Sequence, residues 1–145
     1  MEFEVVTAGG LEELAASYAR TFNAPPWNDG WTPATAKRRL EGMLSGLGTY
    51  GLCAREEGKL LGAVLGQEEQ YYNGVMFNIK EFWVQNGLEG QGIGAALFAA
   101  FEARLKERGV GEIILFTAKG EPPEQFYRKQ GLQPYPGLVF MGKEL

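Results

Sequence analysis

The sequence contains a glycine-rich run that reads Asn86-Gly87-Leu88-Glu89-Gly90-Gln91-Gly92-Ile93-Gly94. Residues 75–84, just before it, alternate as in a strand, and after it apolar residues recur at helical spacing, at Leu97, Phe98, Phe101 and Leu105. A strand that passes through closely spaced glycines into a helix presents backbone N–H groups at the positive helix end. The run therefore indicates a phosphate or pyrophosphate site, although glycines in this position also serve close packing alone.

Two known phosphate-binding motifs can be compared with this run. A Walker P-loop requires a lysine directly after its last glycine, and none follows Gly92 or Gly94. The relaxed Rossmann pattern is matched by Gly90-x-Gly92-x-x-Ala95, but that fold carries the pattern directly after its first strand. Here the run lies past the middle of the chain, so a Rossmann-type nucleotide-binding domain is the weaker interpretation.

The composition limits the available chemistry. Among 145 residues there are 21 glycines, one cysteine and no histidine. Histidine-based nucleophilic triads and imidazole metal sites are therefore excluded, and acid–base chemistry falls to carboxylates, tyrosines, lysines or water. The single thiol, Cys53, is predicted to be a small core residue and forms no internal disulfide.

Charge and hydropathy limit the partners. The net charge of −4 argues against a nucleic-acid partner, which would require a basic face. No apolar run approaches the roughly 18 residues of a membrane span, and the start Met1-Glu2-Phe3-Glu4 lacks the basic residues of a signal peptide. We expect a cytoplasmic protein without a membrane partner.

The pattern along the chain predicts one mixed α/β domain over residues 1–145, because no linker or repeat divides it. Antiparallel hairpins come first, and a right-handed β-α-β crossover through the glycine-led helix then creates a parallel strand pair. The predicted strands are Glu2–Val6, Tyr50–Arg55, Lys59–Gln67, Val75–Val84, Glu112–Thr117 and Leu138–Lys143. The predicted helices begin at Leu11, Pro33, Ile93 and Pro122.

A family resemblance rests on two motifs. The stretch from Glu81 through Gly94 is followed about 30 residues later by Phe126-Tyr127-Arg128-Lys129-Gln130-Gly131-Leu132. Together they resemble the acyl-CoA motif and the downstream aromatic-Tyr signature of the GNAT superfamily of N-acetyltransferases. The resemblance implies an α+β fold with a mostly antiparallel central sheet flanked by helices, in which a splayed parallel strand pair forms the cleft for coenzyme A (CoA).

The resemblance also implies an activity. It is transfer of an acetyl group from acetyl-CoA to a primary amine by direct attack, without a metal. The acceptor would be a cationic small molecule or a peptide amine, and a homodimer is a candidate assembly because dimers are frequent in the family. A non-catalytic acyl-CoA-binding sensor or regulatory module is the alternative.

Roles in binding the donor follow by position. The CoA pyrophosphate would be cradled by Gly90, Gln91, Gly92, Ile93 and Gly94, and pantetheine would bond the main chain of Phe82 and Val84. Tyr127 would protonate the departing thiolate, and its alternative role is to pack a short helix onto the sheet. One departure is Glu89, which stands where the family has arginine or glutamine; its side chain either turns away from the phosphates or weakens CoA binding.

Glu81 is the candidate general base. On a regular strand it would share a face with Val75, Phe77, Ile79 and Trp83. An acid isolated in such an apolar row is desolvated, which suits it to accept a proton from the amine directly or through water. The alternatives are a bulge that breaks this register and a nearby cation that pairs with Glu81.

Candidate acceptor residues lie between the first two helices, where the family's acceptor site is commonly covered. This loop holds the only aspartate of the chain, Asp29, between Trp27 and Trp31. Aromatic faces and a carboxylate suit a cationic amine, although the same residues also shape turns and fill cores. Tyr72, after the third strand, is predicted to add to the wall of this site.

Overall fold

The computed structural model describes residues 1–145, which form two compact units, residues 1–114 and 115–145. We describe each unit by itself. None of the helices combines the length and hydrophobicity needed to cross a lipid bilayer.

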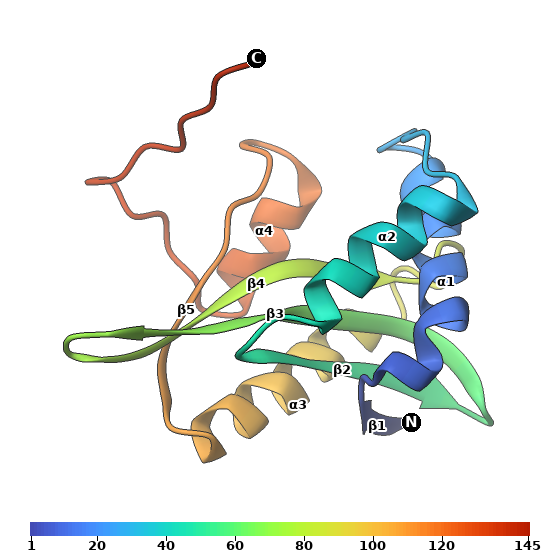
Figure 1. Cartoon of the computed structure of the whole chain (residues 1–145), viewed down its shortest axis with the longest axis horizontal. Coiled ribbons are helices and arrows are strands. Elements are labelled where there is room, and N and C mark those ends of the chain that lie inside the picture. Colours follow the sequence, from blue (N-terminus) through green and yellow to red (C-terminus); the bar gives the residue numbers. More distant parts are fainter. The chain divides into compact units, whose positions relative to one another are not determined.

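The first unit contains a five-stranded sheet with strands in the order β1-β2-β3-β4-β5 (Figure 1). Neighbouring strands are antiparallel except for β4 and β5, which are parallel, so the predicted mixed sheet with one crossover pair is confirmed. The strands are β1 Glu2–Val5, β2 Thr49–Glu56, β3 Lys59–Tyr71, β4 Gly74–Val84 and β5 Val110–Ile114.

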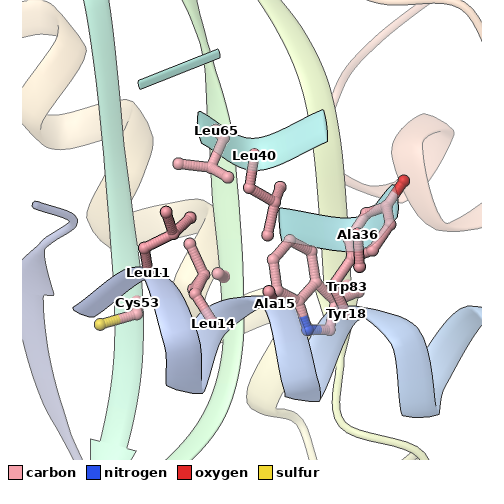
Figure 2. Packing of buried hydrophobic residues seen from close by; sticks show 10 residues of the cluster. Leu11, Leu14, Ala15, Tyr18, Ala36, Leu40, Cys53, Leu65 and Trp83 are labelled. Atoms are coloured by element: carbon pink, nitrogen blue, oxygen red, sulfur yellow. The ribbon is translucent and has the colours of Figure 1, made fainter. Parts of the chain in front are cut away.

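Helices cover both faces of this sheet. A 3-10 turn, Ala8–Gly10, leads into α1 (Leu11–Asn23); α2 (Pro33–Leu44) packs beside α1, and α3 (Ile93–Glu107) crosses the opposite face (Figure 1). Thr32 caps α2 by accepting from the N–H of Thr35, and Pro33 occupies its first turn. Figure 2 shows the core between α1, α2 and the sheet, which comprises Leu11, Leu14, Ala15, Tyr18, Ala36, Leu40, Cys53, Ala63, Leu65 and Trp83.

Strand β4 contains a bulge that changes which side chains face α1. Leu65 pairs with Glu81, but the next residue of β3, Gly66, pairs with Ile79, so Lys80 is an extra residue. Before the bulge, the ring of Phe77 contacts Phe101 of α3; after it, Trp83 contacts Tyr18 of α1. The expectation that Glu81 shares a face of the sheet with Phe77 is therefore wrong. Glu81 lies on the same face as Trp83, toward α1.

The second unit contains one helix, α4 (Pro122–Lys129). The predicted strand Leu138–Lys143 is wrong, because these residues pair with no other strand and apolar content alone does not form a strand. The strand predicted over Glu112–Thr117 runs instead over Val110–Ile114.

Candidate active site

The pairing of the parallel strands β4 and β5 ends before β4 does. Their pairing ends at Asn78 and Ile114, where β5 also ends, whereas β4 continues to Val84. Phe82 and Val84, the residues predicted to bond pantetheine, thus lie on the part of β4 that extends beyond β5. This segment leads directly into the glycine-rich run.

The glycine-rich run ends at an uncapped helix N-terminus. Gly90 and Gly92 have φ angles of 78° and 79°, a left-handed conformation that glycine adopts without strain. Gly92 is the N-cap of α3, with no side-chain cap and no acidic residue in the first turn. The first intrahelical bond runs from Ala96 N–H to the Gly92 carbonyl, so the N–H groups that precede Ala96 in the first turn have no acceptor within the helix.

Glu89, the residue that departs from the family motif, bonds its own loop. Its Oε2 accepts from the backbone N–H of Gly87 at 2.8 Å. The carboxylate thus has a local backbone partner and is exposed.

Buried hydroxyls of α1 hold the end of β4. Ser17 Oγ accepts from Trp83 Nε1 at 3.0 Å and donates to Gln85 Oε1 at 2.6 Å. Thr21 Oγ1 accepts from the backbone N–H of Asn86 at 3.3 Å. Both hydroxyl residues are only 1% exposed, so α1 fixes the start of the glycine-rich run. Sequence reasoning missed them, and the available signal was two small polar residues, four apart, on an apolar helix face.

Glu81 is held by two other elements. Its Oε1 accepts from Tyr18 Oη at 2.9 Å, and from Arg39 Nε at 3.1 Å and Nη2 at 2.8 Å. Oε2 accepts none of these bonds, and the side chain is 12% exposed. The expected isolation of Glu81 among apolar residues is therefore wrong, and the alternative, pairing with a cation, is what the structure contains.

The pKa of Tyr18 depends on its burial and on its hydrogen bond to Glu81. Burial and the Glu81 charge raise the pKa of Tyr18 above its ordinary value. We expect the absorbance titration of the folded wild type to contain a step above the ordinary tyrosine pKa of about 10, and Tyr18→Phe to remove that step. Because the pKa is raised in the folded state, the associated stability is present below pH 10 and decreases above it. A difference between the wild-type and Tyr18→Phe titrations that falls at the ordinary tyrosine pKa would contradict this prediction.

The loop after α1 places two of the predicted acceptor residues at an open depression. Asn23 bonds both the N–H and the carbonyl of Trp31, each at 2.8 Å, and Trp31 Nε1 donates to Asp29 Oδ2 at 3.0 Å. The Trp31 ring lies 5.0 Å from that of Tyr18, centroid to centroid. The depression has a volume of about 470 Å³ and is lined by Asp29, Gly30, Trp31 and Thr35.

Trp27 belongs to the same loop but does not line the depression. Its ring centroid is 5.2 Å from that of Phe22, which in turn contacts Tyr18 at 4.8 Å. The structure therefore connects Asp29, Trp31 and Glu81 through Tyr18, with Trp27 adjoining the same aromatic cluster.

A model of the Acetyltransferase (GNAT) family matches residues 11–132. The chain belongs to the GNAT family. It is an acyl-CoA-dependent N-acetyltransferase, and the Rossmann-type interpretation is wrong. No curated protein matches the sequence.

Solved structures share the fold of this GNAT protein. A ribosomal-protein-alanine N-acetyltransferase from Brucella melitensis biovar Abortus 2308 has a TM-score of 0.78 at 16% identity, covering 99% of this chain and 100% of its own. An aminoglycoside acetyltransferase from an uncultured soil metagenomic sample, in complex with sisomicin, has a TM-score of 0.77 at 19% identity, covering 99% and 95%. A transcriptional regulator from Bacillus halodurans C-125 has a TM-score of 0.77 at 20% identity, covering 99% of each chain.

Two predicted site residues of this acetyltransferase are not part of the group formed by Glu81, Tyr18 and Arg39. Tyr72 lies in a hairpin turn, and Tyr127 belongs to the second unit. Tyr72 is 98% exposed in the turn of the β3–β4 hairpin, whereas Glu81 pairs with Leu65 toward the other end of that hairpin. The structure does not bring it to the acceptor loop. Tyr127 belongs to α4, where its ring contacts Phe126 and its carbonyl accepts from Leu132 N–H, and its role as an acid stays a prediction.

Proposed function

We propose that this protein transfers the acetyl group of acetyl-CoA to a primary amine, on a cationic small molecule or a peptide, by direct attack in a ternary complex. The observation that carries the proposal is the state of Glu81. The β4 bulge turns it toward α1 and α2, and all its hydrogen bonds reach Oε1. Oε2 has none of these partners, and in this proposal it is the atom that accepts the proton.

The donor would bind where β4 passes into α3. Backbone N–H groups of Gly90, Gln91, Gly92, Ile93 and Gly94 would hold the pyrophosphate, with the positive end of the 15-residue helix α3 behind them. Main-chain groups of Phe82 and Val84 would bond the pantetheine arm. This assignment combines the family motif with the uncapped helix end and the extension of β4 beyond β5.

The reaction needs an amine that has lost its ammonium proton. Glu81 Oε2 would accept that proton directly or through water. The amine nitrogen then attacks the thioester carbon, a C–N bond forms and the C–S bond breaks, while a main-chain N–H near Val84 stabilises the carbonyl oxygen. We assign protonation of the departing thiolate to Tyr127, as the family motif suggests.

The acceptor side favours a cation. Asp29 supplies a carboxylate, and Trp27 and Trp31 supply aromatic faces of the kind that attract ammonium groups. The structural relatives include proteins named for acetylating aminoglycosides and the alanine of a ribosomal protein, so both small-molecule and peptide amines are reasonable candidates.

The test is a coupled binding and turnover experiment. Purified protein is mixed with acetyl-CoA and polyamines, aminoglycosides, lysine peptides or peptides with a free N-terminus, and released CoA is compared with the acetylated amine by mass spectrometry. We expect equal amounts of both products with at least one class of amine. Binding of CoA without turnover on any amine would instead favour the non-catalytic binding module.

A further inference from the structure

Arg39 pairs with Glu81 and lies on the same helix as a residue that lines the depression. It lies on α2 one helical turn after Thr35, so the two residues share a side of that helix, and Thr35 lines the depression. The Arg39 side chain is 41% exposed, against 12% for Glu81. An acceptor that enters from the depression and reaches Glu81 therefore also approaches the guanidinium.

Arg39 is the charged neighbour of Glu81. From α1, the facing group is the neutral Tyr18 hydroxyl, and from β3 it is the apolar Leu65. On β4 itself, Lys80 is the exposed extra residue of the bulge and forms no ion pair with Glu81. The carboxylate thus already has a cationic partner before a substrate arrives.

This pairing has a consequence for a cationic acceptor. An ammonium beside an unpaired carboxylate would form an ion pair, which favours the protonated and unreactive amine. The Arg39 guanidinium, which is paired with this carboxylate, counteracts that effect, because a like charge near the amine disfavours its ammonium form. The amine must be neutral to attack, so the cation on α2 favours the reactive state.

We propose that Arg39 is a positioning residue that holds Glu81 through Oε1, leaves Oε2 for the acceptor proton, and favours the neutral form of the bound amine. This inference rests on the proposed function, since it assumes that Glu81 accepts the proton of a primary amine. It adds a residue from α2 to a site that the family motifs place on β4 and α3.

The test compares Arg39→Gln, which keeps hydrogen-bond donors but loses the charge, with Arg39→Lys, which keeps the charge. The kcat of each variant is measured against pH with an amine that the wild type acetylates. In Arg39→Gln we expect the acid limb of the profile to move up by about one pH unit, so that kcat at pH 7 falls about tenfold and recovers at high pH. Arg39→Lys should keep the limb near its wild-type position.

A second acceptor separates an effect on the amine from an effect on Glu81. A fluorinated analogue of the same amine is less basic and is already largely neutral, so Arg39→Gln should slow it less than the parent amine. Arg38→Gln is the matched control, because Arg38 is an exposed neighbour on α2 with no hydrogen bond or ion pair.

The outcomes distinguish the two levels of the proposal. An Arg39→Gln profile that falls equally at all pH values, or an equal loss with both amines, would overturn the role of Arg39 while leaving acetyl transfer intact. Absence of wild-type turnover with every amine would overturn the proposed function and this inference with it. Thermal melting of each variant shows whether it is folded. If Arg39→Gln does not fold, the pH profile of Arg39→Lys still tests the role of the charge, because a displaced acid limb in that variant would overturn the proposal.

Discussion

Substitution of Glu81 by glutamine is expected to lower kcat at pH 7 by about 10²–10³-fold, the range of a lost general base. Glutamine keeps the size of the side chain and a carbonyl oxygen for Tyr18 and Arg39, but it does not accept a proton. The dependence of kcat on pH should therefore change shape, with activity recovering only where the amine itself becomes neutral at high pH, while acetyl-CoA binding stays near the wild-type level. Initial rates of CoA release from pH 6 to 9, with isothermal titration for binding, would measure both.

The matched control is Glu69→Gln, which removes a carboxylate from the neighbouring strand β3. Glu69 pairs with Met76 near the hairpin turn, far along the ladder from the pairing of Leu65 with Glu81. We expect its pH profile to match that of the wild type. If Glu81→Gln also kept the wild-type profile, the Arg39–Glu81 pair would have a purely structural role and another group would have to accept the proton.

The parts of this site that could be predicted from the sequence are those encoded by local pattern. The glycines before α3 require no partner elsewhere in the chain, because positive φ angles and helix spacing are local properties. The strand order likewise followed from hairpins and one crossover. The end of β5 was misplaced, since where pairing stops depends on the partner strand rather than on the residues of β5 themselves.

The environment of Glu81 could not be predicted in the same way. Alternation along β4 predicts that Glu81 shares a face with Phe77, but the extra residue Lys80 shifts the register. The bulge lies opposite Gly66 of β3, where the two strands approach closely. The cation that pairs with Glu81 lies 42 positions earlier in the sequence. A periodic pattern contains no information about such contacts, which arise only when α2 packs on the sheet.

Substitution of Gly66 by alanine is expected to lower the free energy of unfolding by about 3 kcal/mol or more. A Cβ at Gly66 would lie 2.0 Å from the carbonyl oxygen of Asn78 and 2.7 Å from the buried ring of Phe77. Since one contact is with backbone, β3 and β4 must move apart at the bulge. A loss of this size corresponds to a decrease of about 10 °C in Tm.

Gly42→Ala is the control for this change, because Gly42 lies within α2, where an added Cβ meets nothing within 4 Å. It should leave Tm unchanged or raise it, as alanine favours a helix by about 0.5–1 kcal/mol over glycine. Because Glu81 pairs directly beside the bulge, the folded fraction of Gly66→Ala should also show reduced kcat below its melting range. A Tm within 2 °C of the wild type (about 0.5–1 kcal/mol) would mean that the close approach of the two strands at Gly66 is absent in solution.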